Sequence, residues 1–292
     1  NVSAQTLKFT FKKGKKAFTK DFEIKKRREN SANRTSFDAS DVMYLLMPDR
    51  FANGNESNDS SPKLQEKANR SLPGGRHGGD VQGIIDHLDY IQELGATAIW
   101  STPMCEDNDK GYSYHTYGQS DLYQIDARYG SNEDYKRLAA EMHKRDMKLI
   151  KDYVTNHWGA EHWMFKDRPT YDWFHQFPGY AQSNYRMTTQ YDTNASKRDA
   201  KYCMDGWFVP SMPDLNQSNQ LLADYLIQNS IWWVEYASLG GIRHDTHPYA
   251  GKEFMDEFKI LHRTVIISSQ VERLTNSRPI FIYPPVMLCF LF

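Results

Sequence analysis

The sequence predicts an α/β protein built as a partial TIM (β/α)8 barrel, about strands 1 to 5 of it. Two observations predict this fold class. From residue 40 onward, short apolar runs alternate with segments whose apolar residues recur at helical spacing. Long loops rich in polar and aromatic residues follow the apolar runs, and this is where a parallel barrel gathers its active site.

Five segments are expected to be strands and three to be helices. A continuous apolar run is typical of a strand that is covered on both faces. The expected strands are Val42 to Met47, Thr97 to Trp100, Leu149 to Val154, a segment around Ile242, and the strand-like run Thr264 to Ser269. The expected helices are Val81 to Leu94, stopped by Gly95, a helix begun by a capping box of Ser131 and Asp134, and Leu221 to Tyr236.

The chain is expected to divide at residue 36. Weak alternation of Leu7, Phe9 and Phe11, followed by a basic run, predicts that residues 1–36 are the end of a β-sandwich-like N-terminal domain and a linker. Residues 37–292 are then the N-terminal half of the barrel, with a small inserted domain at about 158–211, after the third strand.

Composition excludes several kinds of partner. The formal net charge of −1 gives no electrostatic reason to expect nucleic acid or an anionic membrane. No apolar stretch is long enough to span a bilayer, and the chain begins without a signal core, which predicts a mature or truncated soluble protein. Cys105, Cys203 and Cys289 are too few and too scattered for a disulfide framework or a zinc site. The aromatic content of 14% suits sugar binding and an ordinary core equally.

The clearest candidate for chemistry is the segment Gly241 to His247. Because side chains alternate along a strand, Arg243 and Asp245 share a face, which in a barrel is the interior, while His244 points outward. An arginine beside a carboxylate keeps it ionised and aims it, as a nucleophile that attacks an anomeric carbon requires. A buried ion pair that only stabilises the barrel is an equally weighted alternative.

A second candidate is a cation site in the first long loop. Oxygen-bearing side chains and one backbone carbonyl there suit an ion of the size of Ca²⁺. The expected ligands are Asn53, Asn55, Asn58, Asp59, Asp80 and the carbonyl of Gly78. The alternative is a polar turn in which Asp80 only caps the helix that begins at Val81.

Several segments, in one order from about Asp41 to Phe258, resemble the signature regions of the α-amylase family (glycoside hydrolase family 13), and most closely its neopullulanase and cyclomaltodextrinase branch. They are Asp49 to Asn55, Tyr114 to Tyr117, Asp152 to His157, Met212 to Asn216 and Gly241 to His247. The resemblance implies retaining hydrolysis of the α-glucosidic bonds of starch-type glucans such as pullulan, cyclodextrin and maltooligosaccharides.

The same resemblance implies roles for individual residues. Asp245 would be the nucleophile and Arg243 its positioning partner. His115 and His157 would hydrogen-bond the sugar, Tyr117 would stack beneath it, and Tyr114 belongs to the same subsite segment. The resemblance also implies bound calcium, a homodimer for the full-length family, and a periplasmic or extracellular location, with a cytoplasmic one left open.

The chain departs from this family at the second carboxyl group. The family's acid is a Glu in a Gly-Glu-x-Trp-like segment, which is absent, and the nearest candidate is Glu272. Its neighbour Arg273 would lower the pKa of that carboxyl, whereas a general acid needs it raised. The third family carboxylate has no counterpart, and Thr116 replaces an expected Gly.

After about Phe258 the resemblance ends, as in a frameshifted or misassembled tail. The sequence therefore predicts an α-glucan hydrolase that is impaired in this chain. The alternatives are a non-catalytic protein that binds maltooligosaccharides and an inactive fragment.

Overall fold

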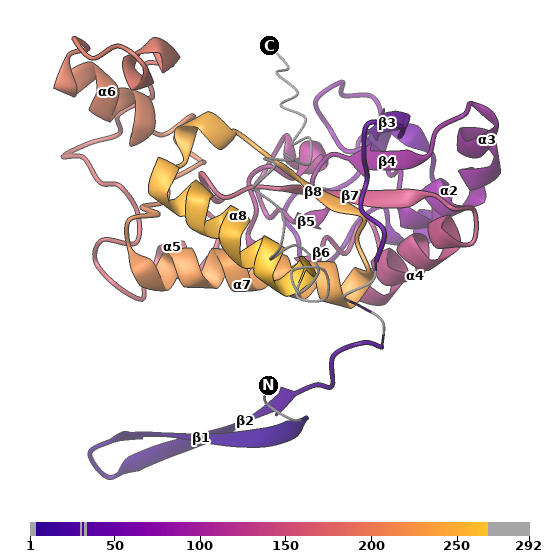
Figure 1. The fold of residues 1–292 in the computed structure, drawn as a ribbon, viewed down its shortest axis with the longest axis horizontal. Coiled ribbons are helices and arrows are strands. Elements are labelled where there is room, and N and C mark those ends of the chain that lie inside the picture. The colour runs from indigo at the N-terminus through magenta and orange to yellow at the C-terminus, as the bar shows by residue number, and fades with distance from the viewer. Residues whose placement is uncertain (1–3, 30, 32–33, 268–292) are drawn as a thin grey trace, which may run out of the picture.

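The computed structural model describes residues 4–29, 31 and 34–267. Its centre is a four-stranded parallel sheet in the order β3-β4-β7-β8 (Figure 1). The strands are β3 (Met43–Leu46), β4 (Ala98–Ser101), β7 (Lys148–Tyr153) and β8 (Gly241–His244). These are the first four predicted strands: β3, β4 and β7 each begin within one residue of the expected start, and β8 contains Ile242. Consecutive order and parallel pairing bring the carboxyl ends of all four strands to one edge.

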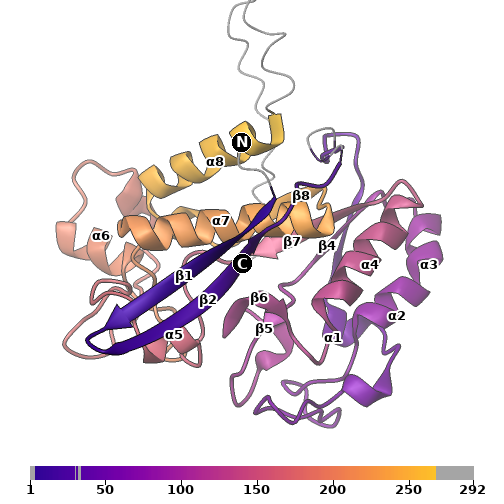
Figure 2. The ribbon, with the colours of Figure 1, turned by 90° about the horizontal axis from the view of Figure 1, so that it is seen from below.

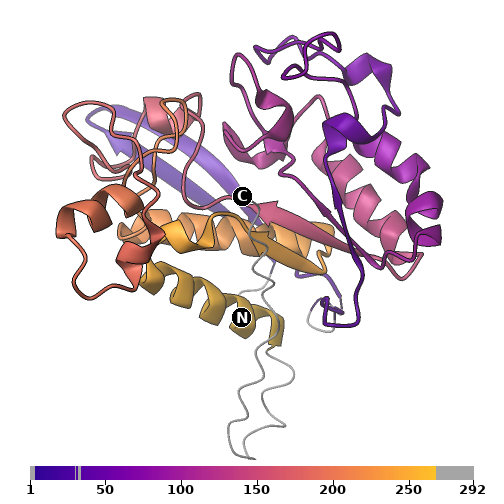
Figure 3. The same cartoon turned by 90° about the horizontal axis from the view of Figure 1, so that it is seen from above.

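Helices cover the sheet in two neighbouring groups, the first to the right in Figures 2 and 3 and the second beside it. The first group is α1 (Pro48–Phe51), α2 (Val81–Asp86), α3 (Leu88–Glu93) and α4 (Asn132–His143), and the second is α7 (Gln220–Ala237) and α8 (Lys252–Ile267). Ile84, Leu138 and Trp233 meet Leu149 of the sheet in the main core. The predicted capping box of Ser131 and Asp134 begins α4. The predicted helix from Val81 to Leu94 is two helices, because the backbone leaves the helical region at His87.

Two short antiparallel strands, β5 (Cys105–Glu106) and β6 (Asp121–Ile125), follow β4. The loop between them contains the 3-10 turn η3 (Ser113–His115). This loop holds the predicted sugar-binding residues of the segment Tyr114 to Tyr117. The pairing of β5 with β6 fixes the two ends of that loop, because both strands belong to one two-stranded sheet.

Residues 158–211, the predicted inserted domain, lie between β7 and α7. They form α5 (Trp163–Lys166), η4 (Met187–Gln190) and α6 (Lys197–Met204), and α6 lies at one end of the molecule in Figure 1. Single β-bridges join His157 to Asp214 and Phe174 to Leu215. The segment is thus anchored to the exit of β7, while its limits as a domain stay a prediction.

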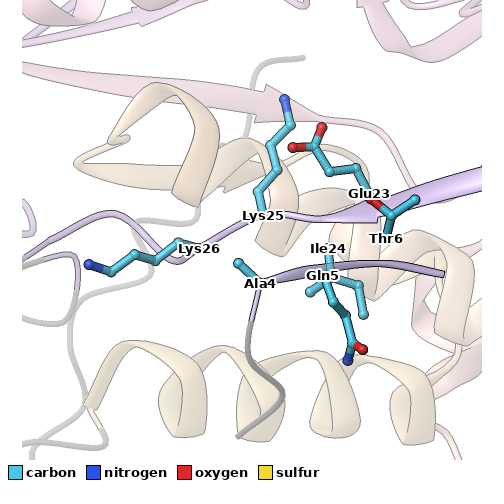
Figure 4. A pocket seen from close by; sticks show the side chains of 7 residues that line it. All are labelled: Ala4, Gln5, Thr6, Glu23, Ile24, Lys25 and Lys26. Carbon is cyan, nitrogen blue, oxygen red and sulfur yellow. The ribbon is translucent and has the colours of Figure 1, made fainter.

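The N-terminal residues form a hairpin of β1 (Gln5–Lys13) and β2 (Lys16–Ile24). Phe11 pairs with Phe18 across the hairpin, and both rings are exposed. At its open end a hollow is lined by residues of both strands and the following chain, namely Ala4, Gln5, Thr6, Glu23, Ile24, Lys25 and Lys26 (Figure 4). The linker is fixed to the barrel part by Arg34, whose Nη1 donates to the Val234 carbonyl at 3.0 Å.

The prediction of a fifth strand at Thr264 to Ser269 is wrong over residues 264–267, which continue helix α8. The β-branched residues there favour a strand locally. The helix prevails because Phe254, Met255 and Phe258 lie on one side of it and are buried in the second core cluster. Residues 268 and 269 lie outside the described residues. Within the described part of the chain, no helix combines the length and the apolar character that crossing a membrane requires.

Candidate active site

The guanidinium of Arg243 joins two carboxylates at the carboxyl ends of neighbouring strands. Its Nη1 donates to Asp245 Oδ1 at 2.5 Å and to Asp152 Oδ1 at 3.0 Å. The parallel register places Asp152 of β7 beside Arg243 of β8, and strand alternation turns Asp245 to the same side. The predicted contact between Arg243 and Asp245 is therefore present, and Asp245 is 6% exposed.

Asp152 is the most heavily bonded carboxylate of this cluster. Besides Arg243, its Oδ2 accepts hydrogen bonds from Trp100 Nε1 at 2.9 Å and from the Tyr117 hydroxyl at 3.2 Å. Burial, followed by repulsion from Asp245, raises the pKa of Asp152 to about 7 against the attraction of Arg243. Asp152 therefore fixes the position of the guanidinium that contacts Asp245.

His244, between the two site residues, faces the helical layer as predicted. Its ring lies 5.2 Å from that of Phe258 in α8, and its Nε2 is 2.8 Å from the Thr155 hydroxyl. A histidine is accommodated here because Thr155 supplies a polar partner inside the layer.

His115 and Tyr117 come to the same site from the loop between β5 and β6. Tyr117 N donates to His115 Nδ1 at 3.1 Å, and the two ring centroids lie 5.5 Å apart. Burial, followed by the nearby His157, lowers the pKa of His115 to about 4, so its ring is neutral near pH 7. Between them Thr116 has φ of +52°, a left-handed conformation that glycine adopts more easily, and its hydroxyl donates to the Pro103 carbonyl.

His157 is buried at the exit of β7. Its Nε2 makes no hydrogen bond to any residue that the structure describes, while its ring lies 5.2 Å from that of Phe208. Burial lowers the pKa of His157, and the charge of Asp245 opposes that shift. A buried polar atom without a partner carries a free-energy cost, so this nitrogen is suited to accept or donate a hydrogen bond to a ligand.

Tyr114 lies to one side of this cluster. The Arg50 guanidinium sits 4.1 Å from the centroid of the Tyr114 ring, and the His115 ring lies 5.2 Å from it. The structure thus brings Asp245, Arg243, His115, Tyr117 and His157 into one region bordered by Tyr114. Glu272 lies outside the described residues.

Four side chains of the predicted cation site form two hydrogen-bonded pairs. Asn53 Nδ2 lies 2.7 Å from Asp59 Oδ1, and Asn58 Nδ2 lies 3.2 Å from Asp80 Oδ2. A Cβ on Gly78 would lie 2.6 Å from Asp59 Oδ1, which shows how closely the backbone approaches this carboxylate.

Other contacts use part of this ligand set. The Asn55 side chain caps η2 (Glu56–Asn58), and Asp80 Oδ1 accepts from Gly83 N at 2.7 Å as the N-cap of α2. Asp80 Oδ2 is not used by that cap, and the buried Asn58 Oδ1 has no hydrogen-bond partner within the described part of the chain. Among the described residues no three His, Cys, Asp or Glu side chains gather as metal ligands. Any cation here would therefore depend on amide and carbonyl oxygens beside two carboxylates, a donor set that suits Ca²⁺.

Two residues of the site were missing from the predicted set. Asp152 was expected only as the first residue of a segment that resembles a family signature, and Trp100 only as the end of a strand. The motif that contains Asp152 was visible, but the register that pairs Asp152 with Arg243 joins strands 91 residues apart. The Trp100 ring, 4.9 Å from the Arg243 guanidinium, depends on the same strand order.

Comparison with known proteins places this site in a family. The family model described as "Alpha amylase, catalytic domain" matches residues 45–270. A cyclomaltodextrinase of Geobacillus thermopakistaniensis (strain MAS1) is 34% identical over 227 residues, which cover 75% of this chain and 35% of the relative. Neopullulanase 2 of Thermoactinomyces vulgaris is 34% identical over 237 residues, which cover 77% of this chain and 37% of the relative.

Solved structures agree. An α-amylase of Anoxybacillus superposes with a TM-score of 0.65 at 34% identity, over 82% of this chain and 46% of that one. The α-amylase of Geobacillus thermoleovorans in complex with acarbose has a TM-score of 0.61 at 35% identity, over 77% of this chain and 44% of that one. The chain spans less than half the length of these four relatives. Its matched residues extend over most of its own length, and the chain belongs to the α-amylase family of glycoside hydrolases.

Proposed function

We propose that this chain carries the nucleophile half of a retaining α-glucan hydrolase site, with Asp245 as the nucleophile. The observation that supports this most is the single guanidinium of Arg243 held between Asp152 and Asp245. The guanidinium, 2.5 Å from Asp245 Oδ1, fixes the direction of that carboxylate. An ionised, oriented carboxylate is what attack on an anomeric carbon requires.

The substrate class that we propose is a starch-type α-glucan. Relatives of this chain are named cyclomaltodextrinase and neopullulanase, and an α-amylase relative binds acarbose. The Tyr117 ring offers a flat face to a pyranose, and the unpartnered Nε2 of His157 offers a hydrogen bond to a hydroxyl. Because His115 and His157 have lowered pKa values, both present neutral rings to an uncharged sugar.

The partner that Asp245 would need is a general acid. A retaining glycosidase holds its second carboxyl group about 5–5.5 Å from the nucleophile. Asp152 is bonded to the same guanidinium as Asp245. It already accepts hydrogen bonds from three donors, which are Trp100, Tyr117 and Arg243. We infer that this chain cleaves unactivated glucans slowly, because loss of general-acid assistance costs about 10²–10⁴-fold.

We also propose that Ca²⁺ binds at Asn53, Asn58, Asp59, Asp80 and the carbonyl of Gly78. Asn55 belongs to the predicted set, although its side chain is engaged as a cap. Asn58 Oδ1, which has no hydrogen-bond partner among the described residues, would supply one ligand atom, and Asp80 Oδ2, which accepts from Asn58 Nδ2 and not from the helix cap, would supply another. The ion would hold the first loop against the start of α2 and stabilise the folded chain.

The proposed function is tested by separating binding, nucleophilic attack and acid assistance. Titration with acarbose measures binding, a glycosyl fluoride measures attack without need of an acid, and reducing-sugar release from pullulan, cyclodextrin and starch measures the whole reaction. We expect binding and attack to be detectable and release from glucans to be slow. Binding without attack would instead identify a non-catalytic maltooligosaccharide-binding protein.

A further inference from the structure

A buried lysine and a buried thiol meet behind the candidate active site. Lys151 Nζ lies 3.3 Å from Cys105 Sγ, and the two residues are 2% and 1% exposed. Lys151 belongs to β7 and Cys105 to β5, so the contact joins two elements. No carboxylate of the described residues forms an ion pair with Lys151.

Aromatic rings hold the amino group in this position. Lys151 Nζ lies 4.4 Å from the centroid of Trp233 and 5.3 Å from that of Tyr135, and both rings are buried. A cation gains some stabilisation from such rings, but burial of an ammonium group without a carboxylate is costly. The amine therefore has one close polar side chain, the thiol of Cys105.

We propose that Lys151 and Cys105 form an oxygen-bridged cross-link, Nζ–O–Sγ, when the protein is exposed to hydrogen peroxide. An oxygen bridge spans two bonds and keeps nitrogen and sulfur further apart than a direct N–S bond would. It therefore needs less movement from the observed 3.3 Å separation. This modification site is independent of the proposed hydrolase function.

The reaction balances with two molecules of peroxide. In the first step Cys105 Sγ attacks one peroxide oxygen, the O–O bond breaks, and a sulfenic acid and one water form. In the second step Lys151, having released its ammonium proton, forms an N–O bond to the sulfenic oxygen. The second peroxide accepts two electrons and leaves as two waters. The product contains one oxygen more and two hydrogens fewer than the separate amine and thiol.

Burial determines which oxidant can act. Burial raises the pKa of the Cys105 thiol, against the opposing charge of Lys151, so little thiolate is present. A small uncharged oxidant that reaches the interior is therefore required, and the reaction is slower than at an exposed thiolate.

The link would connect the two elements that carry the candidate site. Lys151 directly precedes Asp152, and Cys105 begins the excursion that carries His115 and Tyr117. Joining β5 to β7 would fix the Tyr117 segment relative to Asp152. The cross-link is thus placed to make the site more rigid without contacting it.

The test uses the full chain treated with hydrogen peroxide, digested without reductant and analysed by mass spectrometry. We expect a joined peptide pair containing Cys105 and Lys151, with one oxygen added and two hydrogens removed, that dithiothreitol separates. Cys203 is an internal control, because it is a buried thiol whose polar neighbours are Thr189 and Arg186 instead of a lysine.

The control variants are Lys151→Arg, which keeps the charge, and Cys105→Ser, both checked for folding by circular dichroism. Neither should give the joined pair. A pair without the added oxygen, a sulfinic or sulfonic acid at Cys105 with Lys151 unmodified, or an unchanged chain would each overturn the proposal. A failure of Asp245 to act as a nucleophile would leave this result unaffected.

Discussion

Arg243 Nη1 lies 2.5 Å from Asp245 Oδ1 and 3.0 Å from Asp152 Oδ1, so one guanidinium nitrogen serves carboxylates from two strands. Among the described residues, Asp152 accepts hydrogen bonds from three side chains, whereas the Asp245 side chain is hydrogen-bonded to Arg243 alone. Asp245, the carboxylate with fewer hydrogen bonds, directly follows the end of strand β8.

Replacing Arg243 should destabilise the fold. Arg243→Met leaves Asp152 and Asp245 as neighbouring buried carboxylates without their shared cation, and loss of one partner of a buried pair costs about 3–5 kcal/mol. Urea unfolding at pH 7 measures this difference. Arg243→Lys keeps the positive charge but not the planar guanidinium, so its free energy of unfolding should fall by less. Equal stability of Arg243→Met and the parent would contradict the buried-pair account.

The pH dependence of stability should contain a contribution from His162, which stacks on Trp158 with centroids 3.9 Å apart. Burial lowers its pKa to about 3 in the folded state, below the ordinary value of 6.5. The unfolded chain therefore binds a proton between these values that the folded chain does not. The free energy of unfolding should fall by about 1.4 kcal/mol per pH unit as pH decreases through this window. His162→Phe should remove this slope, as measured by urea unfolding between pH 7 and 4. If the free energy of unfolding changed with pH in the same way in parent and variant, His162 would not be the source of the slope.

Calcium should raise the melting temperature, and chelator should lower it, because a cation bound by the folded state stabilises that state by mass action. Gly78→Ala should abolish the response, since its Cβ would lie 2.6 Å from Asp59 Oδ1. Gly95→Ala is the matched control, because Gly95 has φ of +82°, close to the +88° of Gly78, but no atom near its Cβ position. Both variants should lose backbone stability, and only Gly95→Ala should keep the calcium shift. If calcium shifted the melting temperatures of the two variants equally, the ion would not bind at this loop.

Replacing Lys151 by methionine should stabilise the chain. A buried ammonium that lacks a carboxylate costs several kcal/mol, more than the roughly 2 kcal/mol that its contacts with aromatic rings return. Lys151→Met should therefore raise the free energy of unfolding by about 1–4 kcal/mol in urea. A lower value would mean that the contacts with Cys105 and Trp233 outweigh the cost of burial.

The sequence was sufficient where local pattern determines structure. Apolar runs located β3, β4, β7 and β8, and period-two alternation placed Arg243 and Asp245 on one face. Prediction from the sequence failed where contacts between residues distant in the chain determine the structure. Residues 264–267 are β-branched or apolar, yet packing of Phe254 and Phe258 keeps them helical. The role of Asp152 depends on strand register, which no single segment encodes.

The left-handed turn at Thr116 illustrates the same limit on a smaller scale. A glycine was expected from the resemblance, and the φ of +52° explains why glycine suits that position. The threonine is accommodated because its hydroxyl reaches the Pro103 carbonyl, a contact 13 residues away in sequence. The resemblance indicated a glycine at this position, and only the fold reveals how a threonine meets the backbone requirement.

The most direct test of the account is to trap the glycosyl intermediate on Asp245. A 5-fluoro-α-glucosyl fluoride carries a leaving group that needs no protonation, so attack by the nucleophile proceeds without a general acid. Peptide mapping of the treated chain by mass spectrometry locates the label. We predict one glucosyl group on Asp245, none on the Asp245→Asn variant, and little reducing sugar released from starch by either chain. A folded chain that binds acarbose but carries the label on another residue, or no label at all, would contradict the assignment of Asp245 as the nucleophile.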